Sequence, residues 1–143
     1  MSKKIVGYAA LFNTETSLGN FSERIAKGAF ITSIKKDDVR MLWNHDPNYP
    51  IARTKSKTLV LQEDEKGLFF RGEPPDTQWA RDLLVSIKRG DVSQNSFAFE
   101  IVKESWQKRS DGGKVRVLEE CKLYDVSCVT YPAYEQTQCW LED

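Results

Sequence analysis

Short apolar runs with a two-residue period dominate this chain of 143 residues. Alternation of apolar and polar residues is typical of half-buried strands, whereas a helix repeats its apolar positions every three or four residues. The pattern therefore predicts a mainly β fold of the α+β class. The predicted strands cover residues 5–11, 39–43, 58–62, 68–72, 96–103, 114–118 and 123–130.

One segment, residues 76–88, departs from this alternation. Its apolar residues recur at helical spacing, as at Leu83 and Ile87, and so share one face of a helix. Asp76 follows a Pro-Pro pair and is the predicted N-cap, while Gly90 stands just past the last turn. We therefore predict one amphipathic helix between two groups of strands.

Two glycine-containing segments mark further local structure. A short helix or turn is predicted at residues 30–34 after Gly28, and residues 111–113, Asp-Gly-Gly, are predicted to form a hairpin turn. The sequence contains no internal repeat, low-complexity tract or linker. The expectation is a single domain over residues 1–143, a length sufficient for one core.

Charge and apolar content limit the expected partners. The 21 Lys and Arg residues equal the 21 Asp and Glu residues, so no global basic field predicts binding to nucleic acid. No apolar stretch approaches the ~20 residues needed to cross a bilayer, and the N-terminal apolar run is too short for a signal peptide. We expect a protein made in a cytoplasm, with neither a nucleic acid nor a membrane as its partner.

Cysteine and histidine usage argues against a metal site. Cys121, Cys128 and Cys139 lack Cys-x-x-Cys spacing, and with a single histidine they do not supply the ligands of a typical zinc site. They are predicted to be reduced thiols that mainly pack. We expect no metal and no other cofactor.

The single histidine, His45, stands in the tripeptide Asn-His-Asp after a predicted strand. Imidazole has an unperturbed pKa near physiological pH, so His45 is the candidate general base if the chain is a hydrolase. The alternative is a histidine that serves only a turn or a hydrogen bond.

A second candidate is Ser96, at the start of a predicted strand. A nucleophilic serine must be held by rigid backbone, and strand alternation places Ser96 and Ala98 on one face, with Phe97 and Phe99 on the other. The aromatic rings would then fill the core while Ser96 faces a less crowded side. Without a Gly-x-Ser-x-Gly motif, an ordinary strand serine is the alternative.

The third candidate is Asp125, which lies within an apolar, β-forming run. A carboxylate is costly to bury without a partner, and an imidazole that becomes positive during proton transfer is such a partner. The alternative places Asp125 at an exposed strand edge without a role.

Together these segments resemble the tailed-phage prohead proteases, the procapsid maturation serine proteases related to herpesvirus assemblin. The similarity covers nearly the whole chain, in order, and no single motif is specific by itself. The matching segments are residues 7–13, 21–25 with 28–30, 44–46, 58–61 with 63–64 and 67–68, 89–91, 96–99, and 125–127 with 129–134.

The resemblance implies roles for these residues. It makes His45 the base and Ser96 the nucleophile of a serine endopeptidase, on an assemblin-like β-barrel with one or two flanking helices. Herpesvirus relatives use a second histidine on a late strand. This chain has none, so a carboxylate must replace it: Asp125 is our choice and Glu120 the alternative. Asp46 is set aside, because neighbours on an extended strand point to opposite sides.

The resemblance also implies a biological setting. The protease would be packed inside the procapsid in the host cytoplasm and would cleave the scaffolding protein, or a scaffolding domain of the major capsid protein, and itself. Herpesvirus relatives require dimerisation, so a homodimer is a candidate assembly. Backbone amides of residues 131–134 are candidate oxyanion donors.

Two other functions fit the same residues. The first is a non-catalytic capsid-assembly module that binds the scaffold on the same fold. The second is a thiol protease in which Cys121 or Cys128 is the nucleophile, although a buried and inert thiol is the ordinary fate of a cysteine in a β-rich run.

Overall fold

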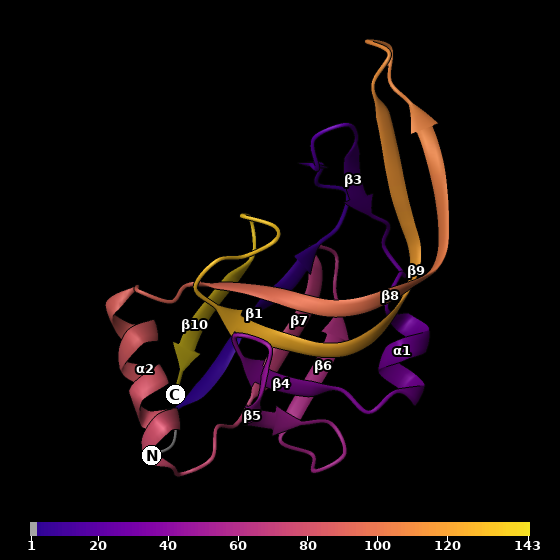
Figure 1. Ribbon diagram of the computed structural model, residues 1–143. Coiled ribbons are helices and arrows are strands. Elements are labelled where there is room, and N and C mark those ends of the chain that lie inside the picture. The colour runs from indigo at the N-terminus through magenta and orange to yellow at the C-terminus, as the bar shows by residue number, and fades with distance from the viewer. Residues whose placement is uncertain (1–2) are drawn as a thin grey trace.

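The computed structural model describes residues 3–143, which form two β-sheets and two helices (Figure 1). The strands are β1 (Lys4–Leu11), β2 (Thr16–Ser17), β3 (Ser22–Ile25), β4 (Arg40–Trp43), β5 (Asp46–Arg53), β6 (Leu59–Glu63), β7 (Gly67–Gly72), β8 (Gln94–Lys108), β9 (Lys114–Val129) and β10 (Gln138–Glu142). The helices are α1 (Ile31–Lys36) and α2 (Gln78–Arg89).

The first sheet joins the two ends of the described chain. Its strand order is β10-β1-β7-β6, and every neighbouring pair is antiparallel. Gly7 on β1 faces the backbone of β10 so closely that a Cβ atom there would lie 1.9 Å from the carbonyl oxygen of Gln138. Only glycine permits this approach.

The second sheet is organised around β9. Along one edge of β9, β3 pairs in parallel with its first half and β4 pairs in parallel with its second half. Strand β8 pairs along the other edge in antiparallel orientation, and β5 pairs with β4. Figure 1 shows the far part of the β8–β9 hairpin extending beyond the body of the molecule.

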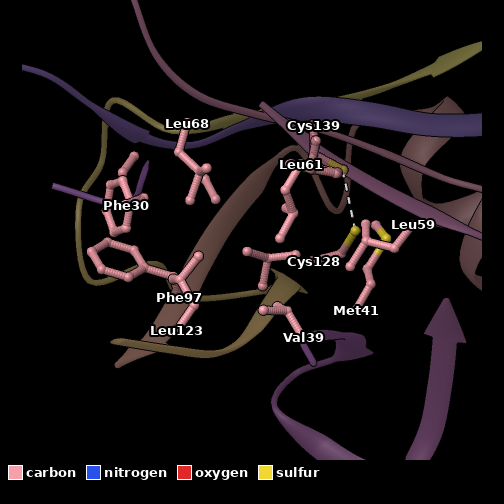
Figure 2. Close-up of a cluster of buried hydrophobic side chains, with 14 of the residues drawn as sticks. Phe30, Val39, Met41, Leu59, Leu61, Leu68, Phe97, Leu123, Cys128 and Cys139 are labelled. Carbon is pink, nitrogen blue, oxygen red and sulfur yellow. Dashed lines mark hydrogen bonds between the residues drawn. The ribbon is translucent and has the colours of Figure 1, made fainter. Parts of the chain in front are cut away.

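The core lies between the two sheets. The first sheet supplies Leu59, Leu61 and Leu68, while Phe97 and Leu123 come from the second (Figure 2). Burial of such side chains, each contributing about 1.5–3 kcal/mol, is the main stabilising contribution available to a domain of this size. Within the described residues, no helix has the length and apolar character needed to cross a bilayer.

The mainly β prediction is confirmed, with changes in detail. The two strands predicted at 114–118 and 123–130 are one continuous strand, because Glu120, Cys121 and Lys122 also pair with β8, with a register shift on each side of the Lys103–Glu120 pair. The strand predicted at 96–103 extends to Lys108. Pairing among residues 3–143 gives two separate sheets, so the predicted barrel is not a single closed sheet.

The predicted helix is also present, and its cap is corrected. Thr77 is the N-cap of α2, and its side chain accepts a hydrogen bond from the Ala80 amide. Asp76, the predicted cap, instead pairs with Arg81. Gly90 ends the helix in the left-handed conformation, as predicted.

Candidate active site

His45 lies at the tip of the hairpin that joins β4 and β5. Trp43 pairs with Asp46, so Asn44 and His45 form a two-residue turn, and both have positive φ angles, 55° and 57°. Tight hairpin turns of this kind require positive φ at both central residues, and Asn and His tolerate it better than most residues. The turn therefore holds His45 away from an extended strand path.

The hairpin tip is bound to the end of β9. The Asn44 amide donates to the carbonyl oxygen of Cys128 at 2.8 Å, and the Asn44 side-chain oxygen accepts from the Thr130 amide at 3.0 Å. The His45 amide donates to Ser127 Oγ at 3.2 Å. Three hydrogen bonds thus fix the backbone that carries the imidazole.

The imidazole contacts the carboxylate of Asp125. His45 Nδ1 lies 2.6 Å from Asp125 Oδ1, and Ser127 Oγ donates to the same oxygen at 2.8 Å. The side chain of Asp125 is only 12% exposed, whereas the side chain of His45 is 36% exposed. An ionised carboxylate only accepts, so the proton of a neutral imidazole belongs on Nδ1 and Nε2 is left as an acceptor.

Ser96 lies on the same face of the sheet as Asp125 and Ser127. In the antiparallel pairing of β8 with β9, Ser96 stands directly opposite Ser127, and Ala98 stands opposite Asp125. Side chains of directly opposed residues project to the same side, about 4.5–5.5 Å apart at Cβ. The hydrogen bonds of His45 within residues 3–143 go to Ser127 and Asp125, and none reaches Ser96.

Ser96 is less accessible than the sequence indicated. Ser96 is 8% exposed. The prediction that Ser96 and Phe97 face opposite sides of the strand is correct, because Phe97 lies in the core. The serine is therefore held in a packed environment, on the sheet face that also bears Asp125 and Ser127.

The strand that carries Ser96 is clamped just before this residue. The Asn95 amide donates to Thr137 Oγ1 at 3.0 Å, and Thr137 Oγ1 donates to the Asn95 carbonyl oxygen at 2.7 Å. The Asn95 side chain donates to the Gln138 carbonyl oxygen at 2.5 Å. No sequence pattern pointed to Thr137, which is 42 positions away, whereas Ser127 could have been found from its two-residue spacing to Asp125.

The other acids considered for the histidine lie elsewhere. Asp46 accepts a hydrogen bond from the Asn48 amide at 2.9 Å, at the start of β5. The reason given for setting it aside was wrong, since His45 is not on an extended strand. Glu120 stands opposite Lys103 and lines a small hollow beside α1, five residues and roughly 16 Å along β9 from Asp125.

The cysteines lie in the core, where thiolate formation is unfavourable. Burial raises the pKa of Cys121 to about 12. The hydrogen bond with Cys139, across 3.5 Å between sulfur atoms, raises the pKa of Cys128 well above its ordinary value (Figure 2). A thiolate is the reactive form, so these thiols are poor nucleophiles. Across the described residues, no three His, Cys, Asp or Glu side chains converge as metal ligands.

Comparison with known protein families assigns the chain to one of them. The sequence profile described as "Caudovirus prohead serine protease" matches residues 1–142. The chain belongs to the caudovirus prohead serine protease family.

Two individual proteins resemble this family member. The prohead protease of Enterobacteria phage HK97 is 32% identical over 134 residues, which cover 91% of this chain and 56% of that protein. A crystal structure of KSHV protease, in complex with a hexapeptide phosphonate inhibitor, superposes with a TM-score of 0.61 at 9% identity. The match covers 100% of this chain and 66% of KSHV protease, and it confirms the predicted assemblin-like fold.

Proposed function

We propose that this chain is a serine endopeptidase of capsid maturation, with Ser96 as nucleophile, His45 as general base and Asp125 as the acid that orients the imidazole. The observation that carries the proposal is the 2.6 Å contact between His45 Nδ1 and the buried Asp125 carboxylate, on the sheet face that also bears Ser96. Membership of the prohead protease family supports the same assignment.

The proposed reaction follows from the tautomer that Asp125 selects. Ser96 Oγ attacks a peptide carbonyl carbon while His45 Nε2 takes the hydroxyl proton, and the imidazolium then donates this proton to the leaving amine. Asp125 stabilises the imidazolium and does not itself take the proton. Water attacks the resulting acyl-enzyme in a second round of the same proton transfers.

A hydrogen bond between Ser96 and His45 is expected to form when substrate closes the site, since such bonds are often longer without substrate. The amides of Tyr131, Ala133 and Tyr134, in the segment after β9, remain our candidates for the oxyanion donors, whereas Pro132 has no N–H to donate. The Thr130 amide is already used by Asn44.

The proposed substrates are the scaffolding protein, or a scaffolding domain of the major capsid protein, and the protease itself, inside the procapsid. The decisive experiment co-expresses the chain, or its Ser96→Ala variant, with the cognate capsid and scaffolding proteins, followed by mass measurement of all fragments. Fragments are expected only with the unchanged serine. Identical fragment masses in both samples would contradict the peptidase, and assembly without any cleavage would favour the scaffold-binding alternative.

A further inference from the structure

A hollow opens beside the β4–β5 hairpin that carries His45. Its volume of about 650 Å³ lies within the range of roughly 300–1,000 Å³ typical of small-molecule sites, so it can accept more than a solvent molecule. Its apolar lining residues come from β4, from the β5 hairpin and from the segment between β7 and α2: Leu42, Pro47, Pro50, Ile51, Pro74 and Pro75.

The strand register places this hollow near Ser96. Leu42 on β4 stands beside Ser127, and Ser127 stands opposite Ser96, while Pro50 is one strand further away. Strands lie about 4.8 Å apart, so Leu42 is about 10 Å and Pro50 about 14 Å from Ser96. An extended peptide advances about 3.3 Å per residue, so three or four residues span this separation.

The position of His45 sets the direction of that peptide. The imidazole contacts Asp125 and its amide contacts Ser127, so His45 lies over β9, between β8 and β4. In the proposed mechanism His45 gives its proton to the leaving amine, so the half of the substrate that follows the cleaved bond lies on the imidazole side. That half leads towards Leu42 and the hollow.

The charged residues at one end of the hollow already have a partner. Arg53 donates to both carboxylate oxygens of Asp38, and Arg40 lies 3.5 Å from the same carboxylate. The hydrogen bonds from Arg53 hold the pKa of Asp38 at about 2, so the carboxylate stays ionised. The guanidinium groups therefore do not need a charged ligand. Glu73, which also lines the hollow, is paired with Lys4 at 3.3 Å, so the apolar wall is the feature left to be covered.

We propose that this hollow binds a large apolar side chain of the cleaved polypeptide, three or four residues after the scissile bond. The proposal rests on the proposed peptidase function and adds a sequence preference to it. Its physical basis is the removal of apolar surface from water on both the substrate and the hollow.

The test introduces a charge into the hollow. Pro50→Asp is the first variant, and Pro74→Asp places the same charge on the opposite wall without altering a strand. Val60→Asp is the matched control, because Val60 is a 50% exposed strand residue on β6, outside the hollow. Thermal unfolding of all three establishes that each remains folded.

Each protein is incubated with a pool of ten-residue peptides of defined sequence, and the fragments are identified by mass spectrometry, with Ser96→Ala as the blank. The unchanged protein is expected to favour Leu, Ile, Phe or Met at the third or fourth position after the cut. Either proline variant should cleave these peptides about tenfold more slowly, and peptides with small residues there at an unchanged rate.

The outcomes separate the two proposals. Ser96-dependent cleavage without this enrichment, or equal rates in Pro50→Asp, Pro74→Asp and Val60→Asp, would overturn the assignment of the hollow and leave the peptidase intact. Absence of any Ser96-dependent cleavage would overturn both.

Discussion

Two buried carboxylates, those of Asp125 and Glu23, each contact a nitrogen-bearing side chain at β9. The two partners, His45 and Arg116, differ in whether they can exchange a proton near neutral pH. Asp125, 8% exposed, contacts His45 near the end of the strand; Glu23, 3% exposed, accepts from Arg116 Nε at 2.7 Å near its start. Arginine keeps its proton in proteins, whereas histidine exchanges one near neutral pH. The Glu23 pair is therefore a fixed structural contact, and the Asp125 pair can work in proton transfer.

The surroundings of the two pairs differ in the same sense. Arg116 packs over the rings of Phe21 and Trp106, and the Tyr134 hydroxyl also donates to Glu23. The edge of His45 that is not held by Asp125 is open to solvent, in keeping with its 36% exposure. Near the start of β9, Glu23 accepts hydrogen bonds from both Arg116 and Tyr134. Near its end, His45 uses Nδ1 for Asp125 and keeps Nε2 for another partner.

The largest expected effect lies in the Asp125 pair. Asp125→Asn should preserve the fold and lower the cleavage rate by about 10⁴, because an amide can favour the wrong imidazole tautomer and does not stabilise the cation. Glu120→Gln is the matched control and should change little. Rates on one scaffold substrate decide the matter: a large loss in Glu120→Gln with normal activity in Asp125→Asn would reassign the acid and keep the serine mechanism.

Removal of the base should have a comparable effect on cleavage. His45→Ala is expected to remove proteolysis while folding stays nearly intact, since an exposed imidazole contributes little to the core. Thermal unfolding and scaffold cleavage are measured side by side. Full cleavage by a folded His45→Ala protein would end the triad proposal, and loss of the folded state would indicate a structural histidine.

Disruption of the pair between Glu23 and Arg116 should instead lower the stability of the fold. Arg116→Ala leaves a buried carboxylate without its cation and should lower the free energy of unfolding by about 3–5 kcal/mol. Arg24→Ala, which removes exposed hydrogen bonds to Asn13 and Gln107, should stay within about 0.5 kcal/mol. Urea unfolding measures both; equal losses would show that the Glu23 pair contributes no more than a surface contact.

A smaller and mixed effect is expected at Ser127, which joins the His45 backbone to the Asp125 side chain. Ser127→Ala should cost about 1–3 kcal/mol of stability, because it leaves the His45 amide without its acceptor. It should also slow cleavage by tenfold to a hundredfold by loosening the imidazole. Urea unfolding and scaffold cleavage, measured on one preparation, report the two losses. Unchanged cleavage in a destabilised variant would make Ser127 a structural residue only.

The smallest effect concerns alkaline pH. Burial, together with the hydrogen bond to Glu23, raises the pKa of Tyr134 above its ordinary value near 10. Above about pH 10 the unfolded chain releases a proton that the folded protein keeps, so stability falls as pH rises. Tyr134→Phe should lessen this fall by about 1.4 kcal/mol in total between pH 8 and 11, almost all of it above pH 10, measured by urea unfolding. Parallel curves for the two proteins would contradict the assignment.

Much of the fold could be predicted because strands leave a local signal. The alternation of residues in β1, β4, β6 and β7 located these strands within a residue or two, and the helical spacing located α2. Strands β2, β3, β5 and β10 were missed. β2 has two residues and β5 carries two prolines, whereas β3 and β10 are as long as β4 and β6, and their pairing depends on neighbours far along the chain. The two-residue turn at Asn44 was missed because it lacks the usual glycine.

The candidate site was predicted residue by residue, but its geometry was not. The chemical rarity of one histidine and of one acid in an apolar strand singled out His45 and Asp125. Their contact depends on the left-handed turn and on the parallel pairing of β4 with β9, which no local pattern encodes. The same holds for the clamp of Thr137 on Asn95, which joins residues 42 positions apart.

The hydrogen bonds between Asn95 and Thr137 also affect the order in which the parts of the molecule fold. Thr137 directly precedes β10, and β10 pairs with β1, where Lys4 stands opposite Glu142. Contacts between residues so far apart in sequence carry a large loop-closure entropy and slow the folding of β-rich domains. A ribosome that has not yet released residues 137–142 holds a chain in which the backbone beside Ser96 lacks its partner. The backbone beside Ser96 therefore acquires its full set of hydrogen bonds only after residues 137–142 have left the ribosome, late in the folding of the described residues.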